Sequence, residues 1–521
     1  MAAPTRRIGC EPLSLPELLA LARGALAPVL DDAPAHRARL EASLRAVADR
    51  RASGAAVYGV TTGVGASVAN SIPTTLQEEL PNLLLRFHGC GTGAPLAEAE
   101  AAAVLAVRLA SLARVHSGVR PALLERLCTL LRERLLPRIP EEGSVGASGD
   151  LTPLSYLAAL VVGEREATLR GRPLPAAEGL AALGLAPLAL LPKESLALMN
   201  GTSVMTALGV LAWERALQLA RAACALTALV SEATRGNPEH FDARIAAWKP
   251  HPGQVRAAAW IREDLGEEAA ARSRARLQDR YSVRCAPQVI GVLLDAAAFT
   301  RGVLETEANG ANDNPLVDPD TGEILHGGNF YGGHVAFALD GLKAAVAGVA
   351  DLLDRQLVLL CTPETSGGLP ANLVGAEGAA AVVHHGFKAM QIGASALAAE
   401  AAKLTMPAAA FSRSTESHNQ DKVSMGTIAA RDARRILELA ETTAAIALLA
   451  ACQAVDLRER LEPEVPLGPR ARVLRDAVRK AVPHLAADRR QDLDIARVLE
   501  LWRGGALPAG RVAELDPVAG P

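Results

Sequence analysis

Residues 431–455 read RDARRILELAETTAAIALLAACQAV, and this stretch decides the fold class. Alanine, leucine and glutamate dominate it, and neither proline nor glycine interrupts it, which predicts an α-helix. Its uncharged part, residues 442–455, is about 14 residues long, whereas a helix needs about 20 apolar residues to cross a bilayer. We therefore expect a helix that is buried in a protein core.

The same helical spacing recurs along most of the chain. It predicts helices over residues 97–114, 121–135, 204–234, 287–308, 334–360, 376–404 and 427–459. Strand-like stretches are few and short, and Ser14 with Glu17 has the spacing of a capping box that opens a further helix. We predict a mainly α protein with a long up-and-down central helical bundle. Residues 1–200 are expected to form a mixed N-terminal domain, and residues 201–521 the central and C-terminal bundle.

Charge and cysteine content exclude several classes of function. The 521 residues include 54 Lys and Arg and 57 Asp and Glu, so the net charge of −3 gives no basic field for nucleic acid. The seven cysteines are scattered without a CxxC pair, which indicates reduced thiols and a cytoplasmic protein. Glu17 and Arg23 interrupt the apolar N-terminal stretch, so neither a signal peptide nor a membrane partner is expected.

A second unusual stretch is GSVGASGDLTPLSYL, residues 143–157, in which three of the smallest residues stand between a glycine and an acid. Ser148 lacks the GxSxG elbow of a serine hydrolase. The chain also has no HExxH pattern, no clear histidine pair on a helix and no cysteine cluster, so no metal site is predicted. Composition alone leaves a plain loop as the alternative reading of this stretch.

Tyrosine is scarce, and each of its four copies lies in or beside a loop segment. Tyr58 opens YGVTTGVG, a Gly/Thr loop without a phosphate-binding pattern that suits a lid carrying a general base. Tyr281 lies in RLQDRYSVRCAPQ, residues 276–288, in which Gln278, Tyr281, Arg284 and Gln288 recur every three or four residues. This spacing would place them on one side of a helix. Arg284 could hold a carboxylate in a bidentate fork, or form a surface salt bridge.

Together these segments resemble the aromatic amino-acid ammonia-lyases and aminomutases, a family that includes the histidine, phenylalanine and tyrosine lyases. The matching segments are GSVGASGDLTPLSYLA, YGVTTGVG, NGTS, QDRYSVRCAPQ, ANDNP, GGNF and NQD. They occur in the family's order, between about residues 50 and 430. The resemblance implies a cytosolic homotetramer whose active sites combine residues from several subunits, acting on a small aromatic amino acid.

The resemblance also explains the small residues Ala147, Ser148 and Gly149. In this family the tripeptide cyclises to 4-methylidene-imidazol-5-one (MIO), without a metal. The nitrogen of Gly149 would attack the carbonyl of Ala147, and loss of two waters would turn Ser148 into a methylidene. Glycine offers the least hindered nitrogen, and serine supplies the hydroxyl that leaves. The product is an electrophile that carries the difficult step as a bound cofactor would.

By the same resemblance, Tyr58 removes the β-proton of the substrate and Arg284 clamps its carboxylate. Further positions around the ring and the substrate are Asn200, Gln278, Tyr281, Asn314 and Phe330. Gln420 matches the position beside the amine. Glu416 and Lys388 fall at the spacing seen in phenylalanine-type lyases, which favours elimination over migration of the amine.

Phe87 and His88 match the pair that sets substrate selectivity in the family. Histidine lyases have an acid where this chain has Gln420, and an amide is less suited to an imidazole substrate. His88 could bind a phenol by a hydrogen bond. We therefore expect a lyase that converts L-tyrosine to p-coumarate, with other ring-substituted aromatics and then histidine as further candidates. A 2,3-aminomutase for tyrosine or phenylalanine shares the same motifs and is the alternative, and an inactive helical homologue is a third reading.

Overall fold

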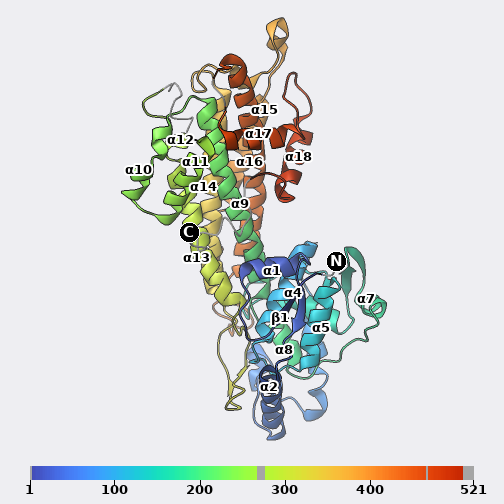
Figure 1. Cartoon of the computed structure of the whole chain (residues 1–521). Helices are drawn as coiled ribbons and strands as arrows, with labels where there is room; N and C mark the ends of the chain where they lie inside the picture. Colours follow the sequence, from blue (N-terminus) through green and yellow to red (C-terminus); the bar gives the residue numbers. More distant parts are fainter. Residues whose placement is uncertain (1–2, 267–275, 465–466, 509–521) are drawn as a thin grey trace. The chain divides into compact units, whose positions relative to one another are not determined.

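The computed structural model describes residues 3–266, 276–464 and 467–508. It is mainly helical, as predicted, and its described residues divide into two compact units (Figure 1). The first unit holds the chain up to Leu211, then Thr300–Asp340 and Pro407–Arg431, and the second unit holds the remainder. The sequence predicted one boundary, near residue 200, whereas the chain first passes from the first unit to the second after Leu211. It then returns twice to the first unit, at Thr300 and at Pro407.

Four long helices carry the chain between the units, and Figure 1 labels all of them. They are α9 (Ser203–Ala233), α13 (Ala286–Ala308), α14 (Gly333–Cys361) and α16 (Gly426–Leu461). Along the chain, α9 leaves the first unit, α13 returns to it, and α14 and α16 leave it again, so the helices run up and down. Trp213 of α9 donates to the carbonyl of Ala297 in α13 at 3.1 Å, and Gln356 of α14 donates to Thr227 of α9 at 2.9 Å.

Helix α16 contains the stretch that predicted the fold class. Its length and apolar composition would allow it to cross a membrane, but 89% of its most apolar window is buried inside the structure. It is therefore a core helix, as expected for residues 442–455. Arg215 of α9 binds Glu441 of α16 through two hydrogen bonds of 2.6 and 2.9 Å, which fixes the register of the two helices.

The predicted helix over 376–404 is wrong before residue 388. Helix α15 begins only at Lys388 and ends at Lys403. Residues Gly378–Val383 form a short 3-10 helix, and Gly386 then has a φ of +54°, which an α-helix cannot accommodate. Among the described residues, the remaining α-helices of the second unit are α10 (Ala243–Ala247), α11 (Pro252–Leu265), α12 (Tyr281–Arg284), α17 (Pro469–Arg479) and α18 (Gln491–Arg503).

The first unit mixes helices with small sheets. Its shorter helices are α1 (Leu15–Ala22), α2 (Pro34–Ala52), α3 (Leu80–Phe87), α4 (Glu98–Leu112), α5 (Pro121–Arg132), α6 (Leu151–Val161), α7 (Ala176–Ala182) and α8 (Glu194–Met199). Strands β1 (Thr5–Ile8) and β2 (Ala27–Leu30) pair in parallel. The antiparallel sets are β3 (Thr92–Pro95) with β5 (Pro140–Glu142), β4 (Leu135–Pro137) with β6 (Glu166–Leu169) and β7 (Arg172–Pro175), and β8 (Leu316–Val317) with β9 (Ile324–Leu325).

Helix α4 is the core element of the first unit. Every residue from Ala101 to Leu112 is buried, and the helix packs against α1, α5 and α8. Helix α1 opens with the predicted capping box, in which Ser14 N donates to Glu17 at 2.8 Å. Helix α8 in turn contacts α3 and α6, so the buried α4 supports the elements that surround the 147–149 loop.

Replacing Trp213 tests the packing of the bundle. Trp213 is fully buried, so Trp213→Ala leaves a cavity and removes the indole hydrogen bond to Ala297, and it should destabilise the protein by about 3–5 kcal/mol. Trp248 is 82% exposed, and Trp248→Ala should change stability by less than about 0.5 kcal/mol. Guanidinium unfolding measures both, and equal midpoints for the two variants would contradict the assigned core.

Candidate active site

One pocket of the first unit collects many of the residues predicted from sequence. It is lined by Tyr58, Val64, Gly65, Leu84, Phe87, His88, Ser148, Leu151, Leu196, Met199, Asn200, Glu416 and Gln420. These residues come from the loop after α2, from α3, from the start of α6, from α8 and from the loop before α16. Segments separated by hundreds of residues therefore meet around the side chain of Ser148.

The backbone at Gly149 requires glycine. Its φ is +70°, and a Cβ at this position would collide with the carbonyl of Gly201. Gly149 and Gly201 pair as an isolated parallel bridge, and the N–H of Asp150 donates to the carbonyl of Gly201 at 2.7 Å. The turn before α9 is thus the surface on which the 147–149 tripeptide lies.

Asp150 connects this loop to the first turn of α9. Its buried carboxylate accepts hydrogen bonds from the N–H groups of Val204 and Met205, at 2.9 Å each, in the first turn of α9. A negative charge is favoured at that helix end. The hydroxyls of Ser144 and Thr427 also donate to it. Burial raises the pKa of Asp150, and these four donors oppose the rise. Sequence reasoning assigned no role to Asp150, although its place directly after Gly149 was the available signal.

The other end of the loop is held by the start of α16. Ser424 donates from its hydroxyl to the carbonyl of Gly146 at 3.1 Å, and Met425 N donates to the carbonyl of Val145 at 3.0 Å. The tripeptide is therefore fixed on both sides, turns through a left-handed glycine and presents Ser148 to the pocket. These residues fit the ring expected from the sequence.

Tyr58 faces the same pocket. Its hydroxyl accepts a hydrogen bond from Gly65 N at 2.8 Å, within its own loop. Burial raises the pKa of Tyr58, and the negative charge of Glu416 raises it further, whereas the Gly65 N–H stabilises the phenolate and lowers it. The net shift is upward, so the phenol is protonated at neutral pH. The resemblance had placed Tyr58 as a base, and the structure adds the two groups that oppose one another in tuning it.

Glu416 connects the Tyr58 loop to the segment before α16. Its two carboxylate oxygens accept from Ala66 N at 2.8 and 3.0 Å, and a Cβ at Gly65 would collide with the carboxylate. Glu416 itself has a φ of +52°, which is rare for a residue with a side chain. The strained backbone therefore directs an anion at the loop that carries Tyr58.

The His88 ring is a neutral acceptor in this pocket. Its Nδ1 lies 2.8 Å from the carbonyl of Leu84. Burial lowers the pKa of His88, the Leu84 carbonyl opposes this shift, and the charge of Arg165 adds to the lowering. A neutral ring that donates from Nδ1 leaves Nε2 as an acceptor. Phe87 packs beside it, with ring centroids 4.0 Å apart. Across the pocket lining, Thr415 donates to Oε1 of Gln420 at 3.0 Å, which leaves the NH₂ group of Gln420 as a donor.

Asn200 is a buried residue of the pocket lining. Its Nδ2 donates to the carbonyl of Asn314 at 3.1 Å, and its Oδ1 is buried without a hydrogen-bond partner among the described residues. A buried acceptor left open is costly unless a bound molecule completes it. Asn314 in turn accepts from Gly327 N at 2.9 Å through its side chain, which ties the 326–332 loop to the site.

The remaining predicted residues lie outside this lining. Phe330 is in the first unit, in the loop tied by Asn314, but does not line the pocket. The second unit holds Gln278, Tyr281, Arg284 and Lys388. The guanidinium of Arg284 stacks on the Tyr281 ring at 4.8 Å and donates to the carbonyl of Asp279, and Tyr281 is 71% exposed. The pocket lining therefore lacks the predicted carboxylate clamp.

Comparison with known proteins identifies the family. A family model described as aromatic amino acid lyase matches residues 13–480. The chain belongs to the aromatic amino acid lyase family. Histidine ammonia-lyase of Sorangium cellulosum is 41% identical over 523 residues, covering 98% of this chain and 99% of that protein. The crystal structure of tyrosine aminomutase from Streptomyces globisporus is 37% identical, with 98% of each chain covered and a TM-score of 0.89.

This aromatic amino acid lyase is thus a carbon–nitrogen lyase, as the sequence predicted. Its relatives differ in what their names say they act on. Histidine ammonia-lyase from Trypanosoma cruzi is 34% identical, with a TM-score of 0.88, 99% of this chain and 96% of that chain covered. The curated relatives at about 41% identity are named histidine ammonia-lyases, so similarity alone does not support tyrosine as the substrate.

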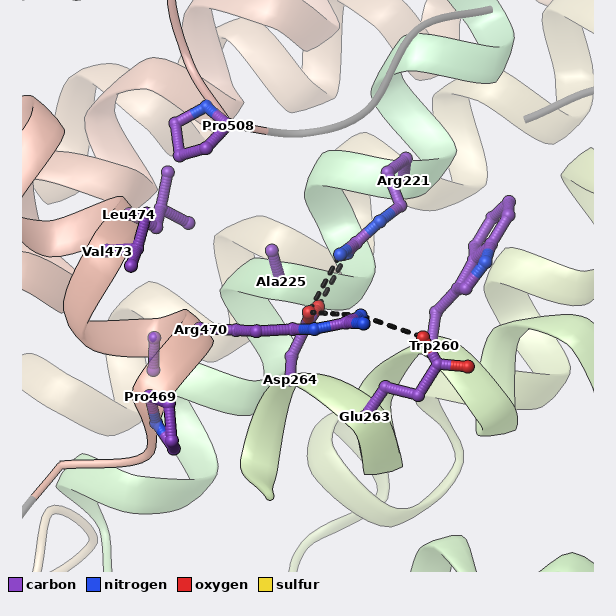
Figure 2. A pocket seen from close by; sticks show the side chains of 11 residues that line it. Arg221, Ala225, Trp260, Glu263, Asp264, Pro469, Arg470, Val473, Leu474 and Pro508 are labelled. Carbon is purple, nitrogen blue, oxygen red and sulfur yellow. Dashed lines mark hydrogen bonds and ion pairs between the residues drawn. The ribbon is translucent and has the colours of Figure 1, made fainter. Parts of the chain in front are cut away.

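A second pocket of the lyase lies in the second unit (Figure 2). Arg221 binds Asp264 through two hydrogen bonds of 2.5 and 2.7 Å, and Arg470 binds Glu263 at 2.8 Å. The indole of Trp260 forms another wall. The cations are already neutralised by these acids, and none of the predicted site residues lines this pocket. The first pocket is therefore the candidate active site.

The Glu416→Gln variant tests the electrostatics at Tyr58. Glutamine can still accept from Ala66 N but removes the charge that raises the pKa of Tyr58, so the phenol should titrate at a lower pH than in the wild type. Tyrosinate absorbance measures this titration, with Tyr58→Phe as the blank for the other tyrosines. Glu142→Gln removes a carboxylate that does not act on Tyr58 and should leave the midpoint unchanged. An unchanged midpoint in Glu416→Gln would show that Glu416 does not act on Tyr58.

Proposed function

We propose that this lyase eliminates ammonia from an aromatic L-amino acid to give an arylacrylate, with L-tyrosine as the preferred substrate and p-coumarate as product. The observation that carries the proposal is the placement of Ser148, Tyr58 and His88 around one pocket. We also propose that residues 147–149 form MIO: Gly149 N bonds to the carbonyl carbon of Ala147, and two waters leave. The ring supplies an electrophile for the substrate's α-amine.

The chain's own residues supply the proton transfer. Tyr58 is the proposed base for the β-proton, and it must be a phenolate to accept that proton. The Gly65 N–H, at 2.8 Å, stabilises the phenolate, and Glu416 disfavours it. Because the pKa of Tyr58 is raised, the fraction of active base increases as the pH rises towards that pKa. Activity should therefore increase from neutral to alkaline pH.

The polar groups of the pocket favour a phenol. Neutral His88 has an acceptor nitrogen that a substrate hydroxyl can donate to, and Phe87 provides an apolar wall beside it. Gln420 offers an amide where an imidazole substrate would be helped by a carboxylate. Histidine stays a competing substrate because relatives of 41% identity are named histidine ammonia-lyases. The second candidate function is a 2,3-aminomutase, favoured by the 37% identical tyrosine aminomutase.

We further propose a cytoplasmic homotetramer with shared active sites. Several large apolar side chains of the second unit are more than half exposed, and a second copy of the chain could cover them: Leu277, Val292, Ile392 and Met406. Tyr281 and Arg284, which the pocket lining lacks, could then come from a second subunit. All seven cysteines are free thiols, which suits a reducing compartment.

One incubation tests the activity. The purified protein is given L-tyrosine, L-phenylalanine and L-histidine together, and chromatography with mass detection follows the products. Coumarate formed faster than cinnamate or urocanate supports the proposal. A β-amino acid with little acrylate identifies an aminomutase, and urocanate as the main product contradicts the choice of tyrosine.

The His88→Leu variant tests the recognition of the phenol. It removes the acceptor nitrogen but keeps the size of the pocket, so the ratio of kcat/KM for tyrosine over phenylalanine should fall by about 10- to 100-fold. Phe87→Leu changes only the apolar wall, so it should change kcat/KM for tyrosine and for phenylalanine by similar factors. An unchanged ratio in His88→Leu would remove His88 from substrate selection.

Mixed oligomers test the sharing of sites. Tyr58→Phe and Tyr281→Phe should each be inactive alone. If the two tyrosines of one site come from different subunits, tetramers assembled at random from both variants regain about a quarter of the wild-type sites. Co-expression with two affinity tags and a turnover assay measures the recovery. Mixed oligomers without activity would place both residues of a site on the same chain.

A further inference from the structure

Arg108 is a charged side chain buried in the core of the first unit. It lies on α4, its exposed fraction is 0%, and it is not part of the pocket lining. Its Nη2 donates to the carbonyls of Ala197 and Asn200, the latter at 2.8 Å. Its Nε and Nη1 are buried without a hydrogen-bond partner among the described residues. A buried guanidinium whose donors are only partly hydrogen-bonded destabilises the folded protein. The charge at this position therefore has a role other than stability.

The carbonyls that Arg108 binds belong to the end of α8 and the turn that follows. Carbonyls at the end of a helix lack partners within that helix, and a cation there is favourable. The next residue, Gly201, lies directly against the guanidinium, because a Cβ on Gly201 would collide with Nη1. The carbonyl of Gly201 accepts from Asp150 N and lies against Gly149. Gly201 therefore contacts Arg108 at its Cα and the 147–149 loop through its carbonyl.

Two buried carboxylates compensate the positive charge of Arg108. Asp150 and Asp313 both act on it, and Asp313 also forms a buried ion pair of 2.6 Å with Lys193. Burial lowers the pKa of Arg108 to about 10, so it keeps its charge at neutral pH. Removing that charge would leave Asp150 less compensated, and Asp150 is the anchor of the loop. Arg108 thus acts on the tripeptide indirectly, through its contact with Gly201 and through its charge interaction with Asp150.

We propose that Arg108 is a positioning residue for the cyclisation of residues 147–149, and that it acts on ring formation and not on turnover. The proposal rests on the proposed function, because it requires that MIO forms. In the step itself, the nitrogen of Gly149 bonds to the carbonyl carbon of Ala147, and the Ala147 oxygen leaves as water with the protons of the Gly149 and Ser148 N–H groups. The hydroxyl of Ser148 leaves with its α-hydrogen as the second water. Arg108 keeps Gly201 in the place that holds Gly149 in its left-handed turn.

Arg120 provides a matched control at the opposite end of α8. Its guanidinium binds Glu194, the first residue of α8, at 2.9–3.2 Å and donates to the carbonyl of Ala189. Glu194 is fully buried, so loss of this pair also destabilises the first unit. Among the described residues, the hydrogen bonds and the ion pair of Arg120 go to Glu194 and Ala189, and not to Gly201 or the 147–149 loop. If destabilisation of α8 limits cyclisation, substitution of either arginine should slow it. If positioning of Gly201 limits cyclisation, only substitution of Arg108 should slow it.

The test follows cyclisation by mass. Wild type, Arg108→Gln, Arg108→Lys and Arg120→Gln are purified at intervals after a short pulse of expression. Intact mass and the proteolytic fragment containing residues 147–149 report the loss of about 36 Da on ring formation. Thermal unfolding reports the stability of the same samples. We expect cyclisation to slow by about tenfold or more in Arg108→Gln, less in Arg108→Lys, which restores the charge, and not in Arg120→Gln.

The outcomes separate this proposal from the proposed function. A wild type that never loses the two waters overturns the cofactor itself. A cyclised wild type with equally fast cyclisation in Arg108→Gln overturns only the role of Arg108. Equal slowing in Arg120→Gln would show that α8 stability, and not Arg108, limits the reaction. If Arg108→Gln is not recovered folded, Arg108→Lys decides, since a wild-type rate in that variant contradicts positioning by the guanidinium.

Discussion

The contact between Gly149 and Gly201 is the constraint on which the candidate site depends. Gly149 lies so close to the carbonyl of Gly201 that it cannot carry a side chain, and the N–H of Asp150 donates to the same carbonyl at 2.7 Å. Gly201 in turn has no room for a side chain because Arg108 and the carbonyl of Asn312 lie against its Cα. The Asp150 carboxylate then accepts from the first turn of α9. One short loop is thereby fixed to the beginning of a bundle helix. The pocket around Ser148 can form only where these backbones meet.

Much of the fold could be predicted because helical periodicity is local. Composition and spacing placed α9, α13, α14 and α16 within a few residues of their observed ends. The same reasoning failed before Lys388, where alanines and valines suggested a helix that Gly386 prevents. The two returns of the chain to the first unit could not be predicted, because a helix does not reveal in its sequence which unit each end joins.

For the candidate site, the sequence indicated several residues but not the interactions between them. Motif resemblance found Tyr58, Ser148, Asn200 and Glu416, and the structure brings these together in one pocket lining. It could not reveal that Glu416 opposes ionisation of Tyr58, because that effect depends on a distance across 358 positions of the chain. Arg108 is the single charged residue of the apolar stretch 101–112, but only the structure shows that its guanidinium is buried against Gly201. Substrate preference depends on a few pocket residues such as His88, whereas overall identity to relatives is spread over the whole chain.

The most direct test of the account is chemical reduction of the proposed electrophile. The protein is treated with sodium borodeuteride, and the fragment containing residues 147–149 is analysed by mass spectrometry. The account predicts deuterium at the carbon derived from Ser148, protection from labelling by bound L-tyrosine, and no labelling in Ser148→Ala. A wild-type fragment that takes up no deuterium and retains the mass of unmodified Ala-Ser-Gly would contradict it.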